Sequence, residues 1–153
     1  MKSLAALLLA GILTGCSVSA ATQSGDPPPA LAPGATNPGV TQANLGQTVC
    51  VSGWTATVRP PASYTSALKR RQMAVLGEAD PAAYEEDHRT PLSSGGAPTD
   101  PRNLWPELWS GPHGAHAKDV LELQVLHDLC SGRTTLARAQ AYWMGDFWMT
   151  TVP

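Results

Sequence analysis

The residues best suited to chemistry lie together in the middle of the chain. Asp87 and His88 are adjacent, the glycine pair Gly95-Gly96 follows them, and Asn103 comes shortly after that turn. Histidine is the side chain best placed to take a proton near neutral pH. An aspartate oxygen is a hard ligand for a divalent ion such as Mg²⁺. Such an ion can hold a phosphodiester oxygen and stabilise the departing 3′ oxygen, so this set of residues suits phosphodiester hydrolysis.

Asn103 and two later histidines could complete such a site. The Asn103 amide can hydrogen-bond across the loop, which would either fix the His88 ring or complete the metal shell. His113 and His116 lie between Asn103 and a predicted helix, and either imidazole could close the ion site. Each residue also has an ordinary interpretation, because isolated Asp-His pairs, turn asparagines and exposed loop histidines are all common.

The order of these motifs resembles the HNH endonuclease family, whose fold is a β-hairpin followed by a helix that grips one metal ion. The shared pattern is Asp-His, then Gly-Gly, then Asn-Leu at Asn103-Leu104, and it covers about residues 84–129. With its two flanking cysteines, the wider run resembles the small secreted HNH-like proteins of bacteria. The resemblance implies an α+β fold, a small ββα-metal finger with flanking helices that is braced by one disulfide.

The resemblance also implies roles for individual residues. His88 would be the general base that activates water, Asp87 a metal ligand, and Asn103 the residue that orients His88. His113, with His116 as the second choice, would supply a further ligand. The cofactor would be a divalent ion, Mg²⁺ first, with Mn²⁺ or Zn²⁺ as alternatives. The chain departs from many family members in lacking paired Cys-x-x-Cys zinc knuckles.

Three basic residues are candidates for phosphate contacts, namely Arg89, Arg102 and Lys118. Arg89 stands where the family pattern usually has an apolar strand residue, so it marks either a phosphate contact or a decayed site. Arg102 and Lys118 are equally well explained as exposed charges. The formal net charge is −2, so no global basic field favours nucleic acid. We therefore expect any nucleic-acid binding to be weak and non-specific.

Residues 1–15 predict a bacterial lipoprotein signal peptide. An apolar run that is too short to span a bilayer follows Lys2, and Leu13-Thr14-Gly15-Cys16 matches the lipobox pattern. We expect cleavage before Cys16 and lipidation of its thiol, and an ordinary signal cut after Ala20 or Ala21 is the alternative. The predicted location is the cell envelope, with the chain lipid-anchored on the extracytoplasmic side and touching the membrane through that anchor only.

Composition divides the rest of the chain in two. Residues 16–43 are rich in Pro, Gly, Ala, Ser and Thr, which predicts a flexible tether. Residues 44–153 have the size of one domain, which we expect to be a monomer. If Cys16 is lipidated, Cys50 and Cys130 remain as a pair in an oxidising compartment. We predict that they form a disulfide, with two buried free thiols as the alternative.

Sequence patterns place secondary structure around these residues. Alternating and β-branched residues predict an extended segment over 48–58 and a strand over 84–92, followed by a Trp- and Pro-rich loop over 103–114. A helix is predicted through 67–76, with a cap at Ser63 or Thr65. Apolar spacing predicts two further helices, over 118–130 and 136–144.

We therefore expect a membrane-anchored, extracytoplasmic, metal-dependent nuclease that hydrolyses phosphodiester bonds of DNA or RNA. This function requires the side chains of Asp87, His88 and Asn103 to converge in one pocket. The alternative is a non-catalytic envelope lipoprotein that uses an HNH-like scaffold as a binding module. In that case the run Trp105-Pro106-Glu107-Leu108-Trp109 would be its contact loop.

Overall fold

The computed structural model describes residues 32–77, 80–145 and 148, and the predicted signal peptide and Cys16 lie outside these residues. The described chain is a mixed α+β fold with a small antiparallel sheet of two strands. In chain order its elements are η1 (Gln42–Gln47), α1 (Trp54–Val58), α2 (Ala62–Leu76), η2 (Pro81–Ala83), β1 (Tyr84–His88), η3 (Leu92–Ser94), η4 (Pro101–Asn103), β2 (Leu104–Leu108), α3 (Ala115–Cys130) and α4 (Leu136–Met144).

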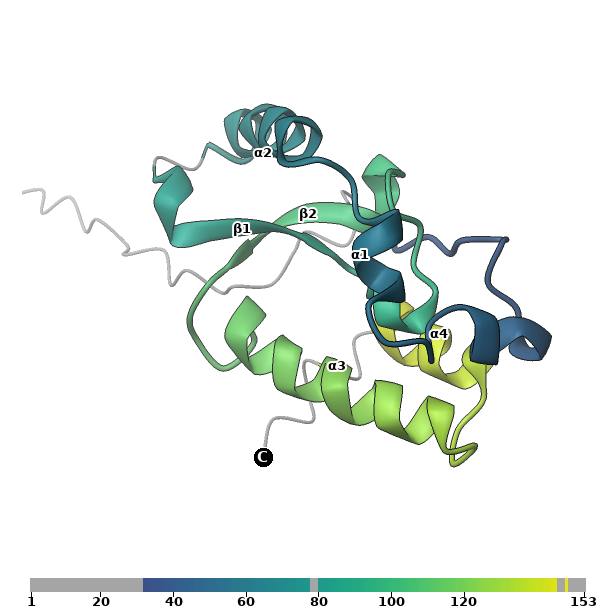
Figure 1. Cartoon of the computed structure of the whole chain (residues 1–153). Helices are drawn as coiled ribbons and strands as arrows, with labels where there is room; N and C mark the ends of the chain where they lie inside the picture. The colour runs from purple at the N-terminus through teal and green to yellow at the C-terminus, as the bar shows by residue number, and fades with distance from the viewer. Residues whose placement is uncertain (1–31, 78–79, 146–147, 149–153) are drawn as a thin grey trace, which may run out of the picture.

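The two strands form the middle layer between two helices (Figure 1). β1 and β2 pair from Tyr84 opposite Leu108 to His88 opposite Leu104. α2 lies along one face of this pair and α3 lies along the other. Side chains on a strand alternate between its faces, so the hairpin presents one set of residues to α2 and a second set to α3.

The connection between the strands, residues 89–103, is long and folds back on itself. Gly95 adopts a left-handed conformation with φ of 71°, which glycine permits at no steric cost. Gly96 has no room for a side chain, because a Cβ there would lie 1.7 Å from the carbonyl oxygen of Thr90. Thr36 also forms an isolated bridge with Gly96. The predicted Gly-Gly turn is therefore a position of close backbone approach.

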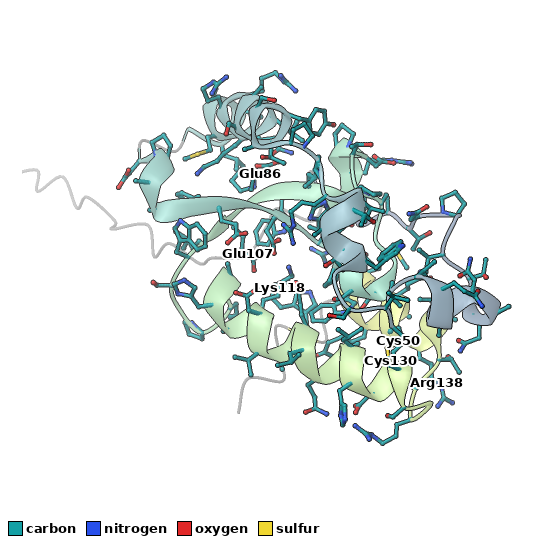
Figure 2. The ribbon with its side chains drawn as sticks, in the orientation of Figure 1. Cys50, Glu86, Glu107, Lys118, Cys130 and Arg138 are labelled. Atoms are coloured by element: carbon teal, nitrogen blue, oxygen red, sulfur yellow. A yellow bond between two sulfur atoms is a disulfide. The ribbon has the colours of Figure 1, made fainter. Side chains whose placement is uncertain are left out.

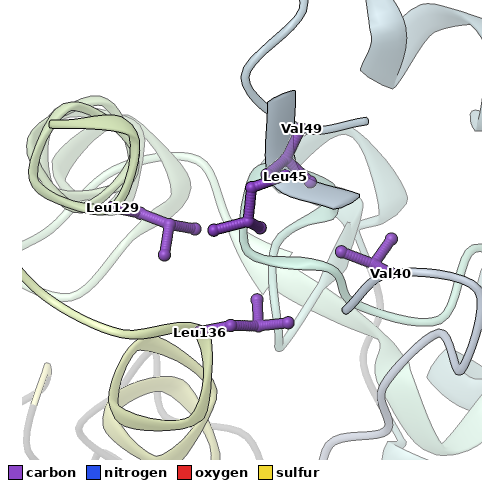
Figure 3. Packing of buried hydrophobic residues seen from close by; sticks show 5 residues of the cluster. All are labelled: Val40, Leu45, Val49, Leu129 and Leu136. Atoms are coloured by element: carbon purple, nitrogen blue, oxygen red, sulfur yellow. The ribbon is translucent and has the colours of Figure 1, made fainter. Parts of the chain in front are cut away.

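The core has two clusters. The first joins the segment around η1 to the C-terminal helices and consists of Val40, Leu45, Val49, Leu129 and Leu136 (Figure 3). The second is built around aromatic rings and consists of Ala32, Trp105, Trp143 and Trp148. The indole nitrogen of Trp143 donates to Ser94 Oγ at 2.9 Å, which ties α4 to the loop between the strands.

The predicted disulfide is confirmed. Cys50 and Cys130 are bonded, with their Cα atoms 5.6 Å apart. Cys130 is the last residue of α3, and the partly buried Cys50 packs against the first core cluster. The bond thus attaches the C-terminal end of α3 to the segment that precedes α1 (Figure 2).

The helices agree closely with the patterns in the sequence. α2 begins earlier than predicted, at Ala62 with Pro61 as its N-cap, so the predicted caps Ser63 and Thr65 lie inside the helix. It ends at Leu76, and Gly77 follows in a left-handed conformation with φ of 72°. α4 has the predicted bounds, and the Thr135 hydroxyl caps it by accepting from the backbone nitrogen of Arg138 at 3.3 Å. α3 begins slightly earlier than predicted, at Ala115. Among the described residues, no helix is both long enough and apolar enough to cross a bilayer.

Three sequence expectations about local structure are wrong. Residues 48–58 form turns and the short helix α1, because Trp54 packs inward against the first core cluster. Leu104–Leu108 is strand β2 and not loop, since an edge strand of a two-stranded sheet tolerates Pro106 without losing a ladder hydrogen bond. Part of the predicted tether belongs to the packed domain, because Ala32 and Val40 are buried in the two clusters.

Candidate functional site

The most chemically unusual place in the structure is the interface between the hairpin and α3. Glu85 pairs with Glu107 and Asp87 pairs with Trp105 across the strands, and all four side chains belong to the face directed toward α3. Lys118 projects from the first turn of α3 into this face. Figure 2 shows Glu107 and Lys118 directed toward each other across the interface, with Glu86 on the opposite face beneath α2.

Lys118 is the centre of this cluster. Its ammonium donates hydrogen bonds to Asp87 Oδ2, to the backbone carbonyl of His88 at 2.8 Å and to Glu122 Oε1 at 2.9 Å. Glu107 Oε2 lies 3.5 Å from the same nitrogen. The side chains of Lys118 and Glu107 are completely buried, whereas those of Asp87 and Glu122 keep some exposure at the edge of the interface.

The charges around Lys118 compensate for its removal from water. Burial alone would lower the pKa of Lys118, but the charges of Asp87, Glu122 and Glu107 raise it well above its ordinary value. Burial would likewise raise the pKa of Asp87, but Lys118 and a hydrogen bond with Glu107 hold it below its usual range. A buried ion pair persists only where such bonds replace hydration. Lys118 and Asp87 are therefore both charged in the folded protein.

Glu107 is protonated in the same cluster. Its burial, opposed only in part by Lys118, raises its pKa to about 9. A protonated carboxyl has an O–H to donate, and Asp87 is its acceptor. Burial also raises the pKa of Glu122 to about 7 and that of Glu85 to about 7. The interface thus contains more carboxyl groups than the Lys118 ammonium can neutralise. The excess negative charge is reduced because the carboxyl groups with raised pKa values stay protonated to higher pH.

His88 and Asp87 do not share a pocket, because neighbouring residues of a strand point to opposite faces. The His88 ring lies on the face opposite Lys118, is 2% exposed, and places Nε2 3.0 Å from the carbonyl oxygen of Pro98. Burial lowers the pKa of His88 below its ordinary value. The structure therefore holds this imidazole in a packed environment, away from the Asp87 carboxylate.

Asn103 closes the loop between the strands. Its side chain is completely buried. Its Oδ1 accepts from the backbone nitrogens of Thr90 at 2.8 Å and Ala35 at 3.2 Å. Its Nδ2 donates to the carbonyl oxygens of Thr90 at 2.9 Å and Ala97 at 3.0 Å. All four of these hydrogen bonds join the Asn103 amide to backbone groups, and none of them joins it to the His88 ring.

The two candidate histidine ligands lie near the start of α3. His116 is exposed, and its ring centroid is 5.5 Å from that of Trp109. His113 is partly buried. Within residues 32–77, 80–145 and 148, no group of three or more His, Cys, Asp or Glu side chains is arranged to hold a metal ion. Asp87 is already bonded to the Lys118 ammonium, so the predicted ligands as placed here do not fit a divalent ion.

Of the three predicted phosphate contacts, only Arg102 is accessible. Its side chain is 72% exposed and is bonded to Asp100. Arg89 is 2% exposed, and its Nη2 donates to the carbonyl oxygen of Met144 at 3.4 Å. Lys118 has no exposed side-chain surface at all. Two of the three cations are thus internal structural groups in the folded chain.

Sequence reasoning found Asp87 but missed Glu107 and Glu122, the other two carboxyl groups around Lys118. Glu107 fell within a run that was interpreted as a contact loop, yet β2 buries it completely. Once 104–108 is known to be a strand, alternation places Glu107 on the face of Trp105. Glu122 had a detectable signal, because it lies one helical turn after Lys118 and forms an (i, i+4) ion pair with it.

A surface hollow lies elsewhere, beside the disulfide. Its volume is about 440 Å³, and it is lined by residues 49–53 and 55 together with Leu123, Leu126, His127 and Cys130 of α3. None of the residues that contact the Lys118 ammonium lines it. The Lys118 cluster is therefore an internal interface, and it is not the wall of this hollow.

Comparison with known proteins adds no assignment to this geometry. No protein-family model, no curated protein and no solved structure matches the chain.

Proposed function

We propose that this chain is a non-catalytic domain of the bacterial cell envelope, lipid-anchored through Cys16, in which the hairpin and α3 serve as a rigid scaffold. The observation that carries the proposal is the position of the Lys118 ammonium, which lies between the Asp87 carboxylate and the His88 carbonyl oxygen. The Asp87 carboxylate, which metal-dependent phosphodiester hydrolysis would need as a ligand, is thereby used to hold the fold together.

The surroundings of His88 support this proposal. A general base must lie within hydrogen-bond reach of the water it activates. The ring nitrogen Nε2 of His88 is instead 3.0 Å from the Pro98 carbonyl oxygen, and the residue is 2% exposed. Asn103, the predicted orienting residue, bonds to backbone groups of the loop. Both residues are buried, His88 with 2% and Asn103 with 0% exposure.

A scaffold outside the cytoplasm agrees with the covalent bracing of the domain. Disulfides persist in oxidising compartments and are rare in the cytosol. The Cys50–Cys130 bond fixes one end of α3, and the Lys118 cluster fixes the other end against β1 and β2. The lipobox at Cys16 supports the same location, although Cys16 lies outside the described residues.

A nicking assay separates this function from a nuclease. Purified full-length chain would be incubated with supercoiled plasmid in Mg²⁺ or Mn²⁺, beside the variant His88→Ala and a buffer blank. We expect no nicking above the blank for either protein. The nuclease is the competing outcome because two strands followed by a helix, here β1, β2 and α3, is the order of elements in the HNH fold. Metal-dependent nicking by the wild type that disappears in His88→Ala would overturn the proposal.

A further inference from the structure

The Lys118 cluster brings together an amine, a carboxyl group and a second, proton-carrying carboxyl group. We propose that Lys118 and Asp87 condense into an intramolecular amide, so that a second covalent bond in addition to the disulfide ties α3 to the hairpin. This inference stands independently of the nuclease question, because it concerns a reaction of the chain with itself. It is argued from the contacts of three residues, Lys118, Asp87 and Glu107.

The two reacting groups are held in contact by the fold. Lys118 Nζ donates directly to Asp87 Oδ2, and the His88 carbonyl at 2.8 Å fixes the direction from which the nitrogen approaches. Lys118 comes from the first turn of a long helix, and Asp87 comes from the paired region of β1. Groups held in this way react as if at very high concentration, because the entropy of their encounter is already lost in folding.

Glu107 is placed to move the protons of the reaction. It lies on β2, hydrogen-bonds to the Asp87 carboxyl group, and has Oε2 3.5 Å from Lys118 Nζ. It is completely buried, and it is protonated at neutral pH because burial raises its pKa to about 9. A carboxyl group in contact with both reacting groups can give a proton to one and take a proton from the other.

The surroundings favour condensation over hydrolysis. The ring centroid of Trp143 lies 6.0 Å from Lys118 Nζ, and Trp105 stands opposite Asp87 across the sheet. Trp105 and Trp143 are both buried, and the Lys118 side chain has no exposed surface. A completely buried lysine beside aromatic rings meets little bulk water, which would otherwise reverse the formation of an amide.

The reaction balances without any other reactant. The Lys118 ammonium passes one proton to the Asp87 carboxylate, which gives a neutral amine and a carboxylic acid. The amine nitrogen attacks Cγ of Asp87, Glu107 donates its proton to the departing oxygen, and that oxygen leaves as water. The nitrogen then returns a proton to Glu107 as the amide forms. The charged pair is the resting state, so we expect a slow, single-turnover reaction after folding.

The amide would give α3 a covalent attachment at each end. Lys118 lies in its first turn and Cys130 is its last residue, and Figure 2 shows the two at separate places along the helix. The disulfide fixes the C-terminal end to the segment before α1, and the amide would fix the N-terminal end to β1. Only the second of these bonds survives reduction.

Peptide mapping of the full-length protein tests the proposal directly. After reduction, alkylation and denaturation, trypsin cannot cleave at an amidated Lys118. We expect the peptide 72–89, which contains Asp87, joined to the peptide 103–133, which contains Lys118 and Cys130. The joined species should be lighter than the two separate peptides together by one water molecule. Recovery of only the separate peptides 72–89, 103–118 and 119–133 from aged, folded protein would overturn the proposal.

Variants assign the roles within the cluster. Lys118→Arg keeps a cation but cannot form this amide, so the joined peptide should disappear. Glu107→Gln removes the proton carrier and should slow appearance of the joined peptide at least tenfold. Glu122→Gln is the matched control, because Glu122 contacts the ammonium and has no hydrogen bond with Asp87. Equal slowing in both glutamine variants would contradict the role given to Glu107. The wild-type map decides the main claim even if Lys118→Arg fails to fold.

Discussion

At the scale of single residues, the most informative side chain is Lys118. A completely buried ammonium is rare among lysines, and here it is surrounded by Asp87, Glu107, Glu122 and a backbone carbonyl. The sequence shows only a lysine in a helical pattern, which is typical of an exposed position. Its burial depends on the hairpin packing against the first turn of α3, where Asp87 of β1 and Glu107 of β2 approach the ammonium. These contacts between distant segments have no local signal.

Replacing Lys118 tests its structural role. Lys118→Met preserves much of the side-chain volume but leaves the Asp87 charge without its partner, and breaking one side of a buried pair costs about 3–5 kcal/mol. We expect a loss of that size in the free energy of unfolding, measured by urea denaturation. The control Glu122→Gln, at a partly exposed partner, should cost about 1 kcal/mol. Equal, small effects of the two substitutions would show that Lys118 does not hold the interface.

Asn103 supports a second residue-scale prediction. Asn103→Ala removes four hydrogen bonds and strands buried backbone groups of Thr90 and Ala97, each of which costs about 1–3 kcal/mol when unpaired. We expect a loss of about 3 kcal/mol or more in the free energy of unfolding. Asn44→Ala, at an asparagine whose bonds are exposed, should cost about 1 kcal/mol or less. An unchanged thermal midpoint in Asn103→Ala would contradict this structural role.

At the scale of elements, the sequence predicted the three long helices well and the strands less well. α3 and α4 have clear apolar spacing and stop signals at Ser131-Gly132 and Gly145, so their bounds follow from local chemistry. β2 was missed because Trp105, Pro106 and Trp109 resemble a loop composition. The structure does not bring Asp87 and His88 together, for a related reason. Adjacent residues of a strand face opposite sides, so Asp87 and His88 could act together only if the segment were not a regular strand.

The hairpin–α3 interface should become less stable as pH rises. The pKa of Glu107 is raised from 4.5 to about 9, that of Glu122 to about 7 and that of Glu85 to about 7. Folded groups with raised pKa values keep protons that the unfolded chain has lost. Their contribution is therefore complete below about pH 4.5 and is lost as pH rises toward about 9.

Urea denaturation at a series of pH values measures how the free energy of unfolding changes with pH. Two other residues have the opposite effect at lower pH. The contribution of Asp87 to stability is lost as pH falls through its lowered pKa. His88 has a pKa lowered from 6.5, so below about pH 6.5 its burial as a neutral ring makes stability increase with pH. We expect the free energy of unfolding to fall between about pH 7 and pH 9, and Glu107→Gln to reduce that fall. The remainder comes from Glu86, beneath α2, whose pKa burial raises to about 8. A wild-type stability that increases across this interval would contradict the proton assignment.

At the scale of the whole molecule, covalent bracing compensates for a small and divided core. The core of the described residues consists of two separate apolar clusters, and neither is large. Composition could predict the disulfide because only two cysteines remain once Cys16 is assigned to the lipobox. It could not place the domain boundary, since Ala32 and Val40 lie in a stretch rich in Pro and Gly and are buried only through distant partners.

The disulfide should contribute strongly to stability. In the chain-entropy model, closing a loop with a sequence separation of 80 is worth about 4 kcal/mol. We expect the double variant Cys50→Ala/Cys130→Ala to lose about that much in free energy of unfolding, measured by urea denaturation under non-reducing conditions. The wild type in a strong reductant should approach the same value. A reductant effect of less than about 1 kcal/mol would show that the rest of the fold already fixes this loop.

The central claim is that the partner of the Asp87 carboxyl group is Lys118 and not a metal ion. Thermal unfolding of the full-length protein with and without millimolar Mg²⁺ or Mn²⁺ tests it most directly, since any ligand bound only by the folded state raises Tm. The account predicts the same Tm with either ion as with chelator. A clear metal-dependent rise in Tm that is present in the wild type and absent in Asp87→Asn would contradict it.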